Sequence, residues 1–317
     1  MKNLIRFPLM RIVSNQQPLL ALFLVAMVSS IGNADDGPAL FDPMDVFDLE
    51  WATDPRVSPD ERNIVYVRQS NDIMKDRQRS NLWKVSSNGK DHRPLSTGLS
   101  NASSPRWSPD NKRLAFISSD SGARQIHMHW MDSGVTAAIS QLQASPSNLS
   151  WSPDGKWLAF TMNVKGSTQP IAKQRTKPKG ATWAEKPIAV TTTRYQYDGQ
   201  GIVEPAYRHV FVVPADGGSA RQLTEGNFNH YGSLAWTPDS ERIFFSAYRS
   251  DDWELVSNEA DIYAVTVSTK ALEQITDEPG AERSPVISPN GQMIAFSRQD
   301  RRPLAYTPDR IAVMALN

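Results

Sequence analysis

The stretch NLSWSPDGKWLAFT, Asn148 to Thr161, occurs in this chain in five related forms. The other four begin at Asp54, Ser104, Ser233 and Ser284, with the sequences DPRVSPDERNIVYV, SPRWSPDNKRLAFI, SLAWTPDSERIFFS and SPVISPNGQMIAFS. The Ser or Thr that opens the motif recurs after 50, 44, 85 and 51 residues, at Ser58, Ser108, Ser152, Thr237 and Ser288. Five copies in 317 residues indicate a repeated structural unit.

Each motif combines a turn with a strand. Ser152-Pro153-Asp154-Gly155 places Pro second and Gly fourth, which is typical of a type I turn. The residues that follow, WLAFT, are apolar on both alternating faces, and this pattern predicts a strand buried on both sides. The same prediction applies to NIVYV, RLAFI, RIFFS and MIAFS in the other copies.

A second hairpin pattern comes after most of the motifs. It is seen in NLWKVSSNGKDHRPLS, HVFVVPADGGSARQLT and DIYAVTVSTKALEQIT, which begin at Asn81, His209 and Asp261. Two hairpins per repeat give four antiparallel strands, and such repeats of roughly 40–50 residues are typical of propeller blades. We therefore predict an all-β protein, a β-propeller with blades near residues 55–96, 105–142, 149–224, 234–276 and 285–317.

The last blade ends without the fourth strand that the other repeats contain. The sequence thus predicts about four and a half blades, an apparently incomplete propeller whose open strand edges need a partner. We expect either a fragment of a longer gene product or a chain that another segment completes.

Two segments lie outside the repeats. The third blade carries an insertion at 165–208, whose first half is basic and contains proline, as solvated loops do, and whose second half has a hairpin pattern around Asp198-Gly199. Before the first blade, DPMDVFDLEWA predicts a short helix with Asp42 as cap and Pro43 at the first position. We expect Phe47 and Trp51 to point inward from it.

The first 34 residues have the pattern of a signal peptide, with a basic start, an apolar run and small residues before a cut after Ala34. We expect a mature domain at 35–317, located in the periplasm or secreted, with no membrane span after cleavage. An uncleaved anchor is the alternative interpretation, although the apolar run is short for a membrane span.

Composition excludes several classes of function. Without residues 1–34 the chain has 31 basic and 34 acidic residues, which gives no reason to expect a nucleic-acid partner. There is no cysteine, so disulfides, thiolate nucleophiles and zinc–cysteine sites are excluded. No motif for a cofactor occurs, and we expect none.

In the order of its helix, repeats and insertion, the chain resembles the N-terminal propeller of prolyl oligopeptidase-family serine peptidases. The resemblance is to the acylaminoacyl-peptidase and dipeptidyl-peptidase-like branch in particular. The resemblance runs from DVFDLEWATDPRVSPD through WSPDGKWLAFT, RYQYDGQG, RHVFVVPADGGSARQLT and DDWE to VISPNGQMIAFS. It implies a propeller that restricts which short peptides reach an α/β-hydrolase domain. The SPDG repeats alone are shared with TolB-like propellers, so a free-standing periplasmic scaffold that binds proteins is the alternative.

The catalytic half of that family is not found in this sequence. A nucleophile elbow requires G-x-S-x-G, and no Ser here lies between two glycines four residues apart. We therefore assign no catalytic residue and predict no hydrolysis by this chain alone.

Candidate binding residues lie where the chain departs from its repeat. One group is in AYRSDDWELVSN, where carboxylates can hold a peptide's amino group and an Arg its carboxylate, and the other is in RYQYDGQG. A solvated, salt-bridged loop is the competing interpretation for the first group, and interdomain packing for the second. The substrate-binding candidates are Arg249, Asp252, Trp253, Glu254, Arg194, Tyr195 and Tyr197.

Other chemistry-bearing residues have structural interpretations. His127 and His129 alternate on a predicted strand, but no third ligand is near in sequence, so we predict no metal site. The repeated Asp60, Asp110, Asp154 and Asp239 are expected to hold their turns through backbone N–H groups. The repeated Trp107, Trp151 and Trp236 are expected to pack between blades.

Overall fold

The computed structural model describes residues 41–317 except 99, 121, 167–174, 185–189, 191, 257, 302–306 and 317. The predicted signal peptide therefore lies outside the described residues. The chain divides into two units, Met1–Asp42 and Pro43–Asn317, and every described strand belongs to the second unit.

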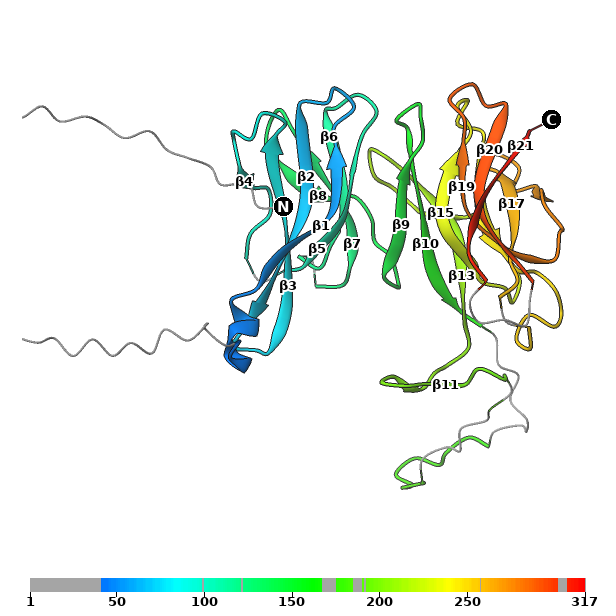
Figure 1. Cartoon of the computed structure of the whole chain (residues 1–317). Helices are drawn as coiled ribbons and strands as arrows, with labels where there is room; N and C mark the ends of the chain where they lie inside the picture. The colour runs from blue at the N-terminus through cyan, green and yellow to red at the C-terminus, as the bar shows by residue number, and fades with distance from the viewer. Residues whose placement is uncertain are drawn as a thin grey trace, which may run out of the picture. The chain divides into compact units, whose positions relative to one another are not determined.

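Besides a two-stranded hairpin, the described residues form five antiparallel sheets that follow one another along the chain, four with four strands and the fifth with three (Figure 1). The first sheet contains β1 (Glu50–Val57), β2 (Asn63–Asp72), β3 (Arg77–Ser86) and β4 (Arg93–Pro94). The second contains β5 (Ala102–Trp107), β6 (Arg113–Ser118), β7 (Gln125–Trp130) and β8 (Thr136–Ala138).

The third sheet contains β9 (Pro146–Trp151), β10 (Trp157–Lys165), β13 (Ala206–Pro214) and β14 (Arg221–Gln222). The fourth contains β15 (His230–Trp236), β16 (Arg242–Ala247), β17 (Asp261–Thr266) and β18 (Leu272–Gln274). The fifth contains β19 (Gly280–Ile287), β20 (Met293–Asp300) and β21 (Arg310–Ala315). Within the insertion, β11 (Gln196–Tyr197) pairs with β12 (Gly201–Ile202).

The repeated motif forms the same turn in every sheet. In the third sheet, the Gly155 N–H donates to the Ser152 carbonyl at 2.9 Å, and the Ser152 hydroxyl donates to Asp154 at 2.6 Å. Asp154 in turn accepts the N–H of Lys156 at 3.0 Å. This confirms the role predicted for the repeated Asp residues. The equivalent hydroxyl–Oδ1 bonds at Ser58, Ser108, Thr237 and Ser288 measure 2.5–2.6 Å.

Four apolar clusters make the core, one between each pair of neighbouring sheets. The middle sheets are therefore packed on both sides, and β6, β10 and β16 are buried on both faces as predicted. For the first and last sheets the prediction is wrong. Only Val65 and Val67 of NIVYV and Ile294 and Phe296 of MIAFS are buried, because described neighbours pack on one face alone.

The short helix before the first sheet is a 3-10 helix, η1 (Pro43–Phe47), with Asp45 in its first turn. The expected inward position is not observed for Trp51 and is observed in part for Phe47. Phe47 is half-buried, while Trp51 lies in β1 and is 38% exposed. The chain leaves the helix within one turn, so Trp51 belongs to a strand and not to a helix face.

Two tryptophans of the repeat tie neighbouring sheets together. The indole N–H of Trp107 donates to the Arg56 carbonyl at 3.0 Å, and that of Trp151 to the Arg106 carbonyl at 2.9 Å. Trp236 is buried in the cluster between the third and fourth sheets, but its indole N–H has no partner among the described residues. The predicted packing between blades is confirmed. In addition, Trp107 and Trp151 each donate a hydrogen bond to the neighbouring sheet, which the sequence did not predict.

Arg106 joins three successive sheets. The innermost strand of the second sheet bulges beside it, with Ser104 at a φ of 56° and a register shift between Ser103 and Arg106. The bulge re-aims the guanidinium, which contacts Asp54 of β1 at 2.9 Å and donates to the Leu149 carbonyl of β9 at 3.1 Å. Burial lowers the pKa of Arg106, and the Asp54 carboxylate opposes that shift.

This geometry predicts unequal roles for two arginines that contact the same carboxylate. Arg106→Ala should lower the free energy of unfolding by about 2 kcal/mol, because it leaves Asp54 and a backbone carbonyl without their half-buried, charged hydrogen-bond donor. Arg56→Ala, which removes an exposed contact within β1, should cost less than about 1 kcal/mol. Urea unfolding of both variants measures the difference, and equal losses would contradict the role assigned to Arg106.

Candidate functional site

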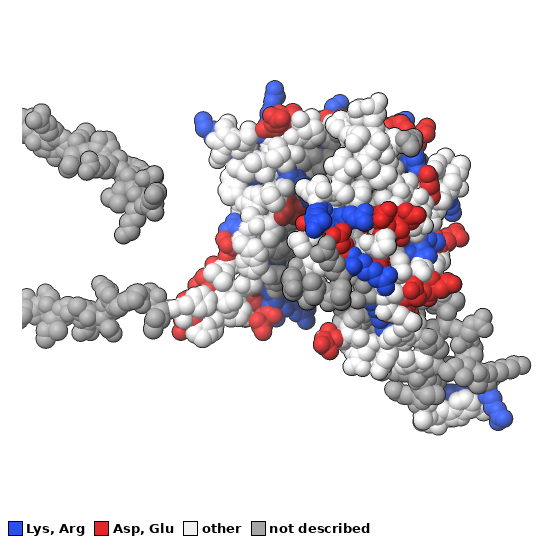
Figure 2. Space-filling model, turned by 45° about the vertical axis from the view of Figure 1, so that its right-hand side comes forward, with Lys and Arg blue, Asp and Glu red and all other residues white. Residues whose placement is uncertain are grey.

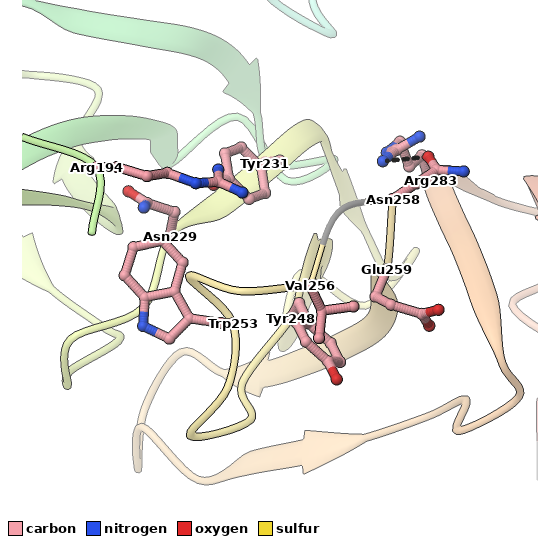
Figure 3. A pocket seen from close by; sticks show the side chains of 9 residues that line it. All are labelled: Arg194, Asn229, Tyr231, Tyr248, Trp253, Val256, Asn258, Glu259 and Arg283. Carbon is pink, nitrogen blue, oxygen red and sulfur yellow. Dashed lines mark hydrogen bonds between the residues drawn. The ribbon is translucent and has the colours of Figure 1, made fainter. Parts of the chain in front are cut away.

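A polar cavity of about 130 Å³ lies where the insertion meets loops and strands of the fourth and fifth sheets. It contains two guanidinium groups, one carboxylate and three aromatic side chains. Figure 3 shows Arg194, Asn229, Tyr231 and Trp253 on one side and the remaining residues on the other. The lining residues are Arg194, Asn229, Tyr231, Tyr248, Trp253, Val256, Asn258, Glu259 and Arg283.

Four separate parts of the chain supply most of these side chains. Arg194 precedes β11 in the insertion, and Tyr231 lies in β15. The connection between β16 and β17 provides the group from Tyr248 to Glu259, and Arg283 comes from β19. The cavity therefore depends on the packing of the fourth sheet against the fifth and on the position of the insertion.

An aromatic contact holds the insertion against the β16–β17 connection. The ring of Trp253 meets Tyr207 of β13 edge to face at 6.0 Å, and the guanidinium carbon of Arg194 lies 6.0 Å from the Trp253 ring centroid. Tyr207 is packed at the base of the insertion against Gly166, where a Cβ would lie 2.7 Å from the Tyr207 ring. A side chain at Gly166 would displace the tyrosine on which Trp253 rests.

Hydrogen bonds add to this attachment. Glu254, proposed from sequence as a ligand for an amino group, instead accepts the backbone N–H of Thr193 at 2.9 Å and so joins the insertion to the loop. Asp252 accepts the Tyr248 hydroxyl at 3.2 Å, and its carbonyl accepts the Leu255 N–H at 2.8 Å. Hydrogen bonding, first of all from Ser250, lowers the pKa of Asp252. Both carboxylates thus shape the loop that carries Trp253.

Arg249 does not line the cavity. Its guanidinium donates to the Glu225 carbonyl at 3.1 Å and to Nε2 of His230 at 2.9 Å, and it lies 4.6 Å from the Phe228 ring centroid. Nδ1 of His230 must donate to the Arg208 carbonyl, 2.6 Å away, so Nε2 is left to accept from Arg249. Burial lowers the pKa of His230 to about 3, which keeps the ring neutral.

Tyr195 and Tyr197 are both partly exposed, at 41% and 48%, and neither lines the cavity. Tyr197 is in the small β11–β12 hairpin, and the Tyr195 carbonyl accepts the Val203 N–H at 2.9 Å. Of the seven residues proposed from sequence, Arg194 and Trp253 line the cavity and the other five do not.

The carboxylate of the cavity is that of Glu259, which sequence analysis did not propose. Its side chain is 7% exposed, and its Oε2 accepts the Gly280 N–H at 2.9 Å. Oε1 lies 3.1 Å from Nε of Arg301 but has no hydrogen-bond partner among the described residues. Next to it, Arg283 donates to Asn258 at 3.2 Å (Figure 3).

Metal ligation finds no support in the described part of the chain, where no group of three His, Asp or Glu side chains is arranged to hold an ion. His127 and His129, which alternate on one strand, make ordinary contacts with neighbouring side chains. His127 stacks on Phe116 with ring centroids 5.6 Å apart, and Nδ1 of His129 is 2.8 Å from the Thr136 hydroxyl.

Charge on the surface is mixed. On the face seen in Figure 2, Lys and Arg lie next to Asp and Glu without a large region of one sign. No helix among the described residues has the length and apolar character needed to cross a bilayer.

Comparison with known proteins relates this chain to peptidases. Residues 182–302, which include the cavity, match the family described as the dipeptidyl peptidase IV N-terminal region. An uncharacterized peptidase, YuxL of Bacillus subtilis, is 28% identical over 204 residues, 64% of this chain and 30% of its own. Dipeptidyl-peptidase 5 of Porphyromonas gingivalis is 22% identical over 268 residues, 80% of this chain and 38% of its own. The chain thus spans about a third of the length of these curated relatives.

The fold is also that of a solved peptidase propeller. An acylaminoacyl peptidase from Pyrococcus horikoshii aligns over 84% of this chain and 38% of its own, with a TM-score of 0.63 and 16% identity. Five antiparallel sheets packed in sequence define a β-propeller of four-stranded blades. More particularly, the chain is similar to the N-terminal propellers found in prolyl oligopeptidase-family peptidases.

The Trp253 contacts predict a specific change in dynamics. Trp253→Ala should accelerate amide hydrogen exchange at Thr193 and Val203 several-fold, because the edge-to-face and cation–π contacts that hold the insertion are lost. Trp183→Ala, which removes an exposed tryptophan of the same insertion, should leave both amides unchanged. Unaltered exchange in Trp253→Ala would show that other contacts position the insertion.

Proposed function

We propose that this chain is the substrate-gating propeller portion of an exported prolyl oligopeptidase-family serine peptidase that acts on short peptides. Its relatives named as peptidases and its family match support the peptidase assignment. A free-standing TolB-like scaffold is less well supported, because the family match and these curated relatives are peptidases. In this proposal hydrolysis belongs to the whole gene product, and the propeller selects and orients the peptide.

The observation that carries the proposal is the presence of both charge signs in one small aromatic cavity. Glu259 offers a buried carboxylate, Arg194 and Arg283 offer guanidinium groups, and the rings of Trp253, Tyr231 and Tyr248 line the same cavity. A peptide terminus combines an ammonium group, a side chain and a carbonyl within a few ångströms. A cavity of about 130 Å³ accommodates such a terminus and not a long peptide.

We assign the recognition of the peptide ammonium group to Glu259. Oε1 is covered and lies 3.1 Å from Nε of Arg301, so an ammonium group donates to it by displacing the Arg301 guanidinium. Arg194 can contact the peptide carbonyl or carboxylate from the opposite side, where it lies over Trp253. Burial raises the pKa of the Tyr231 phenol, so this ring stays neutral beside the ligand.

Binding of free dipeptides tests the assignment. Isothermal titration of the full chain with glycyl-phenylalanine should give binding that N-acetylation of the ligand weakens by about tenfold, or about 1.4 kcal/mol. Glu259→Gln should cause a similar loss, since it removes the charge and keeps the shape. Asp251→Asn, in the same loop and exposed, is the matched control and should bind like the unmodified chain. Equal affinity for the acetylated ligand would rule out an ammonium site.

The proposed export of the protein leads to a separate prediction about its N-terminus. Intact-mass measurement of the native gene product from a periplasmic extract should show a polypeptide that begins at Asp35, with residues 1–34 removed. Met1 retained in an envelope-associated protein would favour the uncleaved anchor, and a product confined to the cytoplasm would contradict export.

A further inference from the structure

The fourth and fifth sheets meet at a junction directly beside the cavity. Here Ala260 and Ala281 form an isolated parallel bridge, outside the antiparallel pairing of the sheets. The Ala260 N–H donates to the Gly280 carbonyl at 3.1 Å, and the Glu282 N–H donates to the Ala260 carbonyl at 2.7 Å. The junction is therefore a short backbone connection, held by few hydrogen bonds.

Two carboxylic acids follow this bridge, one on each strand. Glu282 of β19 has a side chain only 1% exposed; its Oε1 contacts Arg298 at 3.0 Å, while Oε2 has no hydrogen-bond partner among the described residues. Asp261 of β17 accepts a hydrogen bond from Gln274 at 3.1 Å. A buried carboxyl oxygen without a donor is costly when ionised and acceptable when protonated.

With the pair itself included, the junction has six carboxyl groups and four guanidinium groups. Arg298 of β20 forms an ion pair with Glu282 at 3.0 Å and also lies 3.7 Å from both Glu278 and Asp300. The charged groups around the junction are Glu259 before β17, Asp277 and Glu278 after β18, Arg283 of β19, Arg298 and Asp300 of β20, Arg301 after β20, and Arg310 of β21. Arg301 and Arg310 are engaged by Glu259 and Asp300.

The titration of the pair follows from this arrangement. Burial, with the added repulsion of Glu282, Glu259 and Asp277, raises the pKa of Asp261 to about 6. Burial also raises the pKa of Glu282, although Thr276 and Arg298 oppose the shift. A carboxyl whose pKa is higher in the folded state than the ordinary 3.8 stabilises the fold below about pH 4. That contribution is lost as the pH rises through about 6.

We propose that the junction between the fourth and fifth sheets is pH-sensitive: one carboxyl of the Asp261–Glu282 pair is protonated in the closed junction at mildly acidic pH, and its ionisation weakens the Ala260–Ala281 bridge. The bridge connects the segments that carry Asn258 and Glu259 on one side and Arg283 on the other. Weakening it separates residues that line the cavity, so peptide binding should be stronger below about pH 6. This last consequence rests on the function proposed above, whereas the junction itself does not.

Hydrogen exchange of the full chain without peptide tests the junction directly. After correction for intrinsic exchange rates, opening at the Ala260 and Glu282 amides should increase roughly tenfold between about pH 5 and pH 7. Asp261→Asn carries no charge at either pH and should abolish this increase, as should Glu282→Gln. Asp132→Asn, an exposed change in the second sheet, is the matched control and should retain it.

The exchange of individual amides is measured because global stability combines two opposite effects. The lowered pKa of His230 makes the fold less stable as the pH falls, whereas the raised pKa of Asp261 makes it more stable. The comparison with Asp261→Asn removes the histidine contribution, which both proteins share. Unchanged opening of the wild-type junction across this pH range, or the same increase in Asp261→Asn, would overturn the proposal. Neither result would depend on whether the cavity binds peptides.

Discussion

Burial of apolar strands between neighbouring sheets is the constraint on which the rest of this structure depends. Each of the four apolar clusters draws its side chains from two successive sheets, so no sheet contains a complete core of its own. The Ser–Asp turn fixes where each second strand begins, and the bulge in each innermost strand bends the chain toward its neighbour. Arg106 and the indoles of Trp107 and Trp151 then fasten the first three sheets to one another.

The repeat made most of this fold predictable, because the turn and the following strand are local in sequence. What local sequence does not contain is the position of a repeat in the array. NIVYV is as apolar as RLAFI, yet Ile64 and Tyr66 are only half-buried because a described neighbour packs on one face of the first sheet. Likewise, the fourth turn position adopts a left-handed conformation at Glu61 as well as at Gly155, which residue type alone would not indicate.

The candidate site was predictable in part for a similar reason. Arg194 and Trp253 stand in segments that interrupt the repeat, and that interruption was visible in the sequence. Arg249 stands in the same interruption but is half-buried and hydrogen-bonded to His230, a contact that its neighbours in sequence do not reveal. Glu259, Tyr231 and Arg283 were missed because they lie in or beside ordinary strands, and only the packing of the fourth sheet on the fifth brings them together.

The insertion has a consequence for how such a protein can diversify. Strands β10 and β13 remain paired residue by residue from Trp157–Pro214 to Lys165–Ala206, so the insertion departs from a closed hairpin whose ends are already adjacent. Lengthening or shortening a loop between fixed ends changes its closure entropy only slowly. The part of the chain that brings Arg194 to the cavity can therefore vary in length and composition at little cost to the core, which separates the evolution of ligand preference from the evolution of stability.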